Sequence, residues 1–563
     1  MNTFGTLWRI ITFSPWWYLL NVFLQLIRCL FLLLPGLIVS AIFTLLNGNA
    51  PVGWDMWTLC ALLVGIAVAR VTVVLANEAV DATCMEYGNT LLRRNIFAQL
   101  LNKQGAQTLP YPPGELVNRF NTDTTMITET IGNMNIVLGT GIQALVALII
   151  MLTMNWQITL VVLVPLVGSG FVMHHMSTKI QTYYRESRRT SGEASAFLGD
   201  MFHATQTIQL GNAHYRVIER LHKLSEARRH STLRSLLFAD VILDSLARNT
   251  TSIATGVILL LAVQAMKANA FSVSTLALFV AYIDQIASFT VEVSQNMVQY
   301  KQATVSLQRL QAILPVSVAK TEIVAHTPVF LRGEPPQVPV LQRQASPLEQ
   351  LEVRGLTYRY PQSGRGIAHI TFQLQRGSCT VITGRIGSGK TTLLRTILGL
   401  LPRQAGEIVW NGECIASPEQ FFLPPQSAYT PQIPRLWSET LKDNLLMGYP
   451  DEPKRLASAL SAAVMERDIP RLQHGLDTQI GSKGTRLSGG QMQRTAAARM
   501  FLREPDLLVC DDLSIALDVE TEQLLWERLF MKQASTCLLV SHRRFALQYA
   551  DHIVVLKDGQ IVG

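Results

Sequence analysis

The residues best suited to chemistry form a glycine-rich stretch from Gly384 to Thr391, which reads Gly-Arg-Ile-Gly-Ser-Gly-Lys-Thr. Its glycines allow successive backbone N–H groups to turn inward onto phosphate oxygens. Lys390 can place a positive charge at the β- and γ-phosphates of a nucleotide, and the Thr391 hydroxyl is suited to ligate Mg²⁺. Val381 and Ile382 lead into the stretch as an apolar strand, and a helical run leaves it. These flanks favour a phosphate-binding loop over an ordinary glycine turn.

A second stretch, Ser488-Gly489-Gly490-Gln491, comes about a hundred residues later and precedes a helical run from Met492 to Leu502. A serine and two glycines at the start of a helix present N–H donors and the positive end of the helix dipole. On its own the stretch could be only a helix cap. Together with the phosphate-binding loop, it indicates a second anion-binding element.

Five further positions complete the set, and each has a residue type that suits nucleotide chemistry. An aromatic ring stands before a proline, a glutamine follows Thr-Pro, two carboxylates end an apolar strand and a histidine follows Val-Ser. These residues are Tyr360, Gln432, Asp511, Asp512 and His542.

In this order the motifs resemble those of the ATP-binding cassette (ABC) proteins. The resemblance implies that ATP binds to Tyr360 and to the loop residues Gly384, Arg385, Ile386, Gly387, Ser388, Gly389, Lys390, Thr391 and Thr392. Ser488, Gly489, Gly490 and Gln491 match the signature motif, which contacts the nucleotide held by a second cassette. Thr391, Gln432 and Asp511 are then expected around Mg²⁺, and Asp512, His542 and Gln432 are expected to serve hydrolysis.

One residue departs from the family pattern. The family usually has glutamate directly after the magnesium-binding aspartate, where it polarises the attacking water, and this chain has Asp512. Two interpretations follow. Asp512 orients water in an adjusted site, which the intact signature, glutamine and histidine motifs favour, or the chain is the slower half of a heterodimer.

Length and hydropathy predict a membrane domain before the cassette. The chain has 563 residues, of which 48% are hydrophobic, and a mean hydropathy of +0.24. This is too apolar for an ordinary soluble enzyme and too charged for a protein embedded entirely in the membrane. A bilayer core requires about 20 apolar residues per helix. Six windows meet this requirement: 16–46, 55–80, 134–154, 157–176, 242–266 and 274–297.

The loops between these windows predict the orientation. The short connections contain Lys267 as their one basic residue, whereas the long connections are rich in arginine and lysine. The positive-inside rule then places the long loops, both termini and the cassette in the cytoplasm, with the helices in the plasma (inner) membrane. Basic loops facing anionic lipid account for the net charge of +8, so no nucleic-acid partner is required.

The whole arrangement resembles an ABC exporter half-transporter, and the fold class expected is a bundle of six transmembrane helices joined to an α/β P-loop ATPase domain. The domains are expected at 1–314 (membrane domain with two long cytoplasmic loops), 315–350 (proline-rich linker) and 351–563 (cassette). The resemblance implies alternating access in a homodimer or heterodimer, with ATP and Mg²⁺ as cofactors. Fusion of the two domains favours export, and a siderophore-type importer with an exporter fold is the alternative.

The substrate is left open among small molecules, lipids and peptides. Charged side chains at membrane depth are costly and often face a cavity. Arg28 and Asp284 lie nearest the middle of their windows and are candidates for the translocation path. A structural ion pair explains them equally well.

Overall fold

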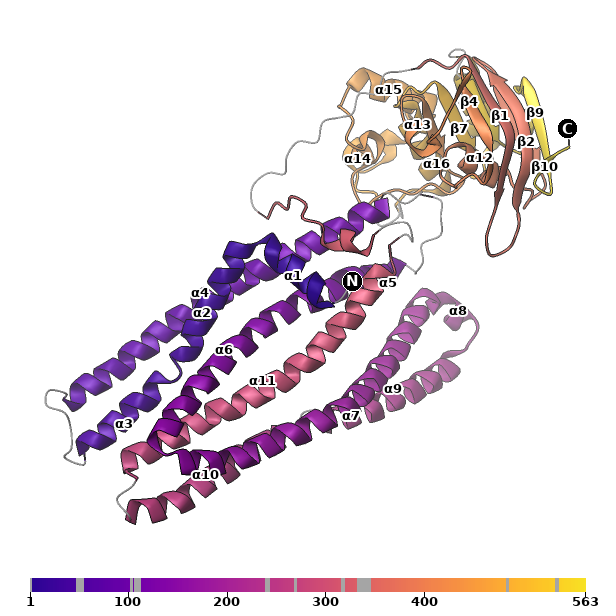
Figure 1. Ribbon diagram of the computed structural model, residues 1–563. Coiled ribbons are helices and arrows are strands. Elements are labelled where there is room, and N and C mark those ends of the chain that lie inside the picture. Colours follow the sequence, from indigo (N-terminus) through magenta and orange to yellow (C-terminus); the bar gives the residue numbers. More distant parts are fainter. Residues whose placement is uncertain are drawn as a thin grey trace. The chain divides into compact units, whose positions relative to one another are not determined.

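The computed structural model describes residues 3–46, 55–101, 105, 113–237, 244–267, 271–314, 319–331, 346–481, 486–531 and 536–562. The chain divides into two compact units. One unit comprises Met1–Leu100 and Pro110–Pro335, and the other comprises Leu101–Leu109 and Pro336–Gly563. In Figure 1 the first is built of helices, and the second contains the β-strands.

The helical unit contains long helices that match the predicted spans. Its elements are α1 (Thr3–Phe13), α2 (Pro15–Leu30), α3 (Leu34–Leu46), α4 (Met56–Leu101), α5 (Pro113–Asn118), the π-helical turn η1 (Arg119–Asp123), α6 (Thr124–Met154), α7 (Trp156–His203), α8 (Thr205–Leu210), α9 (His214–Leu236), α10 (Asp244–Lys267), α11 (Val273–Gln311) and the 3₁₀ turn η3 (Lys320–Val324).

Among the described residues, four helical stretches are long and apolar enough to cross a membrane: Pro15–Leu46, Met56–Leu101, Glu115–Met154 and Val273–Gln311. The other two predicted spans fall on α7 and α10. These helices carry shorter apolar stretches within the described residues, Trp156–Pro165 and Ser252–Val263.

The first span, expected as one element over 16–46, is divided into α2 and α3. Pro35 lacks an N–H, and its ring clashes with the carbonyl four residues earlier, so a regular helix cannot pass through this point. Leu32 and Leu33 instead donate their N–H groups three residues back, to the carbonyls of Cys29 and Leu30. The break therefore follows from one proline.

Several helices extend well beyond a bilayer. α4 has 46 residues, a length of about 69 Å at 1.5 Å per residue, whereas the hydrocarbon core is about 30 Å thick. In Figure 1, α7 and α9 lie side by side as a hairpin with α8 at its tip. α8 lies in the second of the two long cytoplasmic loops predicted from the sequence, and Leu210 at its end is 90% exposed.

Residues 319–331, which lie within the expected linker, pack against the helical unit. Asn95 on α4 is buried and donates to the carbonyls of Ile323 and Ala325 at 3.0 and 2.8 Å. Its Oδ1 accepts from Thr327 at 2.6 Å. Ile323 and Val324 join a core with residues of α1, α4, α6 and α11. Proline content predicted none of these contacts, because they depend on a residue far away in sequence. Residues 315–318 and 332–345 of that stretch lie outside the described residues.

The second unit contains two sheets. An antiparallel sheet has the order β2-β1-β4-β5, and a larger sheet has the order β10-β9-β3-β8-β7-β6. The strands are β1 (Gln350–Arg359), β2 (Gly366–Gln375), β3 (Cys379–Gly384), β4 (Ala405–Trp410), β5 (Glu413–Cys414), β6 (Ser427–Thr430), β7 (Leu507–Asp511), β8 (Thr536–Val540), β9 (His552–Lys557) and β10 (Gln560–Ile561).

Helices complete the second unit, and its strands β7 and β8 are buried at every position, as expected of central parallel strands. The helical elements are α12 (Lys390–Ile397), α13 (Pro418–Phe421), α14 (Leu441–Leu446), α15 (Pro453–Ala462), η4 (Ile469–Arg471), η5 (Gly475–Asp477), α16 (Gly489–Phe501), α17 (Val519–Met531) and α18 (Arg544–Gln548). One apolar core joins β7 and β8 to α14–α17, with Trp526 among its largest buried side chains.

Replacing Asn95 with alanine tests the contact between α4 and residues 319–331. The change removes three hydrogen bonds, each worth about 1 kcal/mol. We expect the segment to open locally and trypsin to cleave after Lys320 faster than in the wild-type protein. Ala98→Ser, an exposed change on the same helix, is the control. Equal cleavage rates in both variants and in the wild type would contradict the prediction.

Candidate nucleotide-binding site

The parallel sheet brings the predicted nucleotide residues to one edge. β3 pairs in parallel with β8, β8 with β7, and β7 with β6. Because parallel strands end on the same side, Gly384, Asp511, Val540 and Thr430 close four strands at a common edge. His542 and Gln432 each follow one of these strands by two residues.

The loop from Gly384 to Gly389 requires its glycines. Gly384 has a φ of +144°, and a Cβ there would lie 2.1 Å from the carbonyl oxygen of Leu556. Gly389 caps α12 with a φ of +104°. The loop side chains at 385 and 386 point outward, with Ile386 98% exposed. Ser388 is buried, and its Oγ has no partner among the described residues.

Lys390 and Thr391 open α12 beneath this loop. The Nζ of Lys390 donates to the carbonyls of Gly384 and Arg385 at 2.8 and 2.9 Å. Burial lowers the pKa of Lys390, and the carboxylates of Asp512 and Asp511 oppose that shift. Thr391 Oγ1 donates to Asp511 Oδ1 at 3.2 Å. The lysine, the threonine and both aspartates therefore lie together.

Asp511 offers one free oxygen to a ligand. The residue is 1% exposed, and its Oδ2 has no hydrogen-bond partner among the described residues. Burial raises the pKa of Asp511, since the charged form loses hydration. An orphaned carboxylate oxygen beside a threonine hydroxyl is a donor set that suits a hard cation such as Mg²⁺.

Asp512 lies at a strained position next to it. Its φ is +55°, a left-handed value that is uncommon for residues other than glycine, and its N–H donates to the Val540 carbonyl at 2.9 Å. Burial raises the pKa of Asp512, and the positive charge that His542 can carry and that of Lys390 oppose this. His542 and Gln432 are themselves exposed.

Tyr360 lies beside the start of α12. It follows β1, its ring meets that of Tyr358 edge to face at 5.0 Å, and its hydroxyl is 3.5 Å from Thr392 Oγ1. The ring is half-buried, so part of it is available for stacking.

The signature residues form a capping box at the start of α16. Ser488 Oγ accepts from the Gln491 N–H at 3.2 Å, and the Ser488 N–H donates to Gln491 Oε1 at 3.0 Å. The amide N–H groups of Gly489 and Gly490 have no partner among the described residues. Gln491 also donates to Asp468, which pairs with Arg494. The start of the helix is thus fixed, with free donors at its positive end.

The structure adds contacts beside the site that the sequence did not predict. Glu522 is 1% exposed and accepts from Ser514 Oγ at 2.6 Å and from Arg543 Nη1 at 3.1 Å. Arg543 also donates to the Ile515 carbonyl at 3.2 Å. Arg543 directly follows His542, so its two hydrogen bonds connect the end of β8 to the segment after Asp512 and to α17.

A second missed contact joins the signature helix to the same segment. Gln493 Oε1 accepts from the Ala516 N–H at 2.9 Å, and the side chain is buried. In the sequence, a glutamate and a glutamine inside helices look like solvated surface residues. Only their burial distinguishes Glu522 and Gln493 from solvated surface residues.

The comparisons with known proteins agree with this geometry. Residues 18–289 match the family model for the ABC transporter transmembrane region, and residues 367–514 match that for ABC transporters. The chain therefore belongs to the ABC transporters, ATP-hydrolysing transport proteins, and its membrane domain has the exporter-type fold.

Relatives of known description span most of its length. An ATP-dependent lipid A-core flippase of Ralstonia nicotianae is 26% identical over 517 residues, covering 90% of this chain and 84% of the relative. One of Xanthomonas axonopodis pv. citri is 28% identical, covering 84% and 78%. The structure of a bacterial Atm1-family ABC exporter with ATP bound has a TM-score of 0.77 at 20% identity, covering 97% of this chain and 94% of the other.

Glu522→Gln tests whether the Glu522–Arg543 contact positions the catalytic segments. We expect kcat for ATP hydrolysis to fall about tenfold with KM little changed, because the charge that holds Arg543 is lost while the nucleotide pocket is not. The free energy of unfolding should fall by only about 1–2 kcal/mol, since Arg543 is 36% exposed and glutamine keeps an acceptor oxygen.

Glu520→Gln, which changes an exposed glutamate two residues earlier, is the matched control. Steady-state ATPase assays and thermal unfolding of both variants show whether the Glu522–Arg543 contact affects catalysis or only stability. An unchanged kcat in Glu522→Gln would show that the contact only stabilises the fold.

Proposed function

We propose that the chain is an exporter subunit that works as a homodimer and moves an amphipathic, lipid-like substrate out of the cytoplasmic leaflet of the inner membrane, with ATP hydrolysed between two cassettes. The observation that carries the proposal is the common edge on which Lys390, Thr391, Asp511 and Asp512 meet beneath the glycine loop. This arrangement accounts for phosphate binding and hydrolysis together.

The protein groups divide the work of phosphoryl transfer to water. The loop amides and Lys390 hold the phosphates, and Tyr360 stacks on the adenine. Thr391, Asp511 and Gln432 would hold Mg²⁺, and the ion would supply positive charge next to the phosphate oxygens. Asp512 orients the attacking water and accepts its proton, and His542 contacts the γ-phosphate.

The separation of the two anion-binding elements supports a pair of cassettes. In the larger sheet, β8 and β7 lie between β3, which carries the loop, and β6. α16 packs on β6 and on α14 and α15. Three strand spacings amount to about 14 Å. The free N–H groups of Gly489 and Gly490 are therefore better placed to meet a nucleotide held by a second cassette, head to tail.

A lipid-like substrate is supported by the relatives, whose names state that they flip lipid A-core. The membrane helices agree with a path that accepts polar headgroups. Asp284 and Ser288 lie one turn apart on α11, and both are exposed. Arg28 instead pairs with Glu78 at 2.8 Å, which favours the structural role that the sequence left open for it.

Asp512 decides between the homodimer and a heterodimer with a slow site. Asp512→Asn keeps the shape and removes the charge, so ATP hydrolysis should fall at least a hundredfold while ATP still binds. Asp512→Glu restores the residue usual in the family and should leave the rate equal or higher. ATPase assays of purified homodimers in lipid check both. A wild-type homodimer that hydrolyses no ATP would favour the heterodimer.

The pH profile gives a second test of the same residue. Asp512 and Asp511 have raised pKa values, and only the ionised pair supports hydrolysis, so activity should be present above these values and lost as the pH falls through them. The acid limb of kcat/KM, which reports the groups of the nucleotide-free enzyme, should therefore lie above the ordinary aspartate pKa of about 3.9, as one coupled transition. An acid limb at the ordinary value would show that these carboxylates do not limit the rate.

Mixed dimers test the head-to-tail assembly. Lys390→Ala disables the loop and Ser488→Arg disables the signature, so each homodimer has two damaged sites. Two mixed dimers then differ. When one chain carries both changes and the other is wild type, both sites are damaged. When one chain carries Lys390→Ala and the other carries Ser488→Arg, one site has an intact loop and an intact signature. We expect ATP binding to survive in Ser488→Arg alone. Full-rate hydrolysis by a demonstrably monomeric chain would contradict the model.

A further inference from the structure

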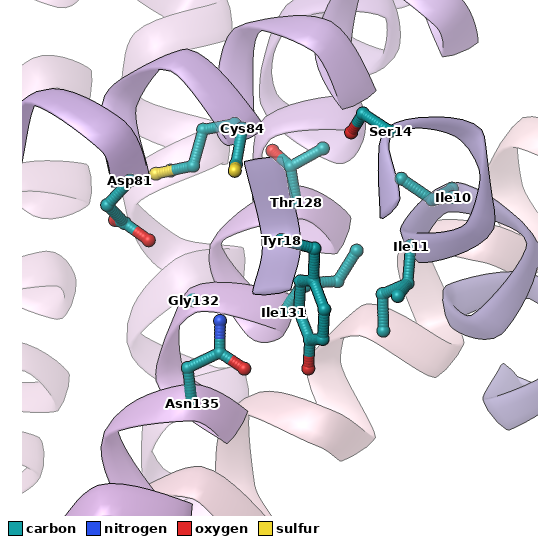
Figure 2. A pocket seen from close by; sticks show the side chains of 11 residues that line it. Ile10, Ile11, Ser14, Tyr18, Asp81, Cys84, Thr128, Ile131, Gly132 and Asn135 are labelled. Carbon is teal, nitrogen blue, oxygen red and sulfur yellow. The ribbon is translucent and has the colours of Figure 1, made fainter. Parts of the chain in front are cut away.

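A small cavity lies among helices α1, α2, α4 and α6 of the helical unit. It has about 20 Å³ of room for the centre of a water-sized sphere, enough for roughly one water molecule. Figure 2 shows its wall, in which Asp81 from α4, Asn135 from α6 and Tyr18 from α2 carry polar atoms. Ser14 and Thr128 add hydroxyl groups, and the remaining lining is mainly apolar.

Asn135 carries an acceptor that the protein leaves unsatisfied. The residue is 4% exposed, and its Nδ2 donates to Asn21 Oδ1 at 2.9 Å. Its Oδ1 has no hydrogen-bond partner among the described residues. A buried acceptor left alone costs about 1–3 kcal/mol, so this oxygen requires a ligand.

Asp81 supplies negative charge to the same cavity. Asn21 Nδ2 donates to its Oδ1 at 2.9 Å, which leaves Oδ2 available. A Cβ on Gly132 would lie 3.4 and 3.5 Å from the two carboxylate oxygens, so the carboxylate lies directly against α6. No ion pair among the described residues includes Asp81, and the nearby Arg28 pairs with Glu78 instead.

We propose that this cavity binds one monovalent cation of the size of Na⁺, held by Asp81 and Asn135. The lining offers oxygen atoms, which hard cations prefer. One carboxylate balances one positive charge and not two. Room for about one water excludes larger organic cations. The bound ion fastens α2, α4 and α6 to one another, and this role does not depend on the transported substrate.

Thermal unfolding of the full-length protein in phosphatidylcholine nanodiscs tests the proposal. The unfolding midpoint is compared in sodium chloride and choline chloride at equal ionic strength, with potassium chloride as a size control. We expect sodium to raise the midpoint by about 3 °C in a saturable manner, and potassium to do so less. Binding of radioactive ²²Na⁺ should reach one ion per chain.

Two variants and a control locate the effect. Asp81→Asn removes the charge but keeps the acceptor for Asn21, and should abolish both the sodium shift and ²²Na⁺ binding. Asn135→Leu should raise the sodium concentration at half effect at least tenfold. Glu86→Gln, an exposed carboxylate change on α4 outside the cavity, should leave both readouts unchanged.

Each other outcome overturns the proposal. Equal midpoints in sodium and choline, with no ²²Na⁺ bound by the wild-type protein, would mean that the cavity holds only water. A shift that persists in Asp81→Asn would place the sodium effect elsewhere. A midpoint raised by phosphatidylethanolamine and not by sodium would assign the cavity to a lipid ammonium group.

Discussion

The nucleotide site of the cassette depends on the hydrogen bond between Thr391 and Asp511. The two residues are 120 positions apart in sequence, and their contact exists only because β3, β8 and β7 run parallel and end together. Apolar strands buried on both faces fix that register. If the register slipped by one residue, Asp511 would turn to the other face of the sheet and the donor set for Mg²⁺ would be lost.

Near this contact, hydrogen bonds connect the end of β8 and helix α16 to the segment that follows Asp512. Arg543 joins the strand end that carries His542 to the carbonyl of Ile515, and Gln493 joins the signature helix to Ala516. The short segment after Asp512 is therefore held from two sides. The Gln493–Ala516 hydrogen bond is partly buried, whereas the Arg543–Ile515 hydrogen bond is exposed.

Sequence patterns predicted the fold class and the four long apolar helical stretches found among the described residues, because both depend on local signals. The nucleotide-binding roles of the residues at the sheet edge stay predictions. Glycines with positive φ, an apolar strand ending in carboxylates and long apolar windows can all be recognised in short stretches. The break between α2 and α3 also had a local signal, Pro35, but the predicted span was defined by its average hydropathy and did not take the proline into account.

Other features had no local signal. Asn95 binds residues more than 200 positions away, and Glu522 looks like any surface glutamate until its burial is known. The cavity at Asp81 needs four helices, α1, α2, α4 and α6, of which α4 and α6 come from separate parts of the sequence. Such contacts depend on tertiary packing, which spacing within one stretch does not encode.

The hydrogen bonds between buried amide side chains of α2, α4 and α6 affect how the membrane domain can insert. Asn21, Gln25 and Asn77 are nearly fully buried and bind one another or α6 across helices. When α2 first leaves the translocation channel, none of these partners is in place, and its amides face hydrocarbon, where unmade hydrogen bonds are expensive. These unmade bonds reduce the free energy that α2 gains by entering lipid alone. Its stable integration should await α4 and α6, so the first half of the membrane domain should insert as a group.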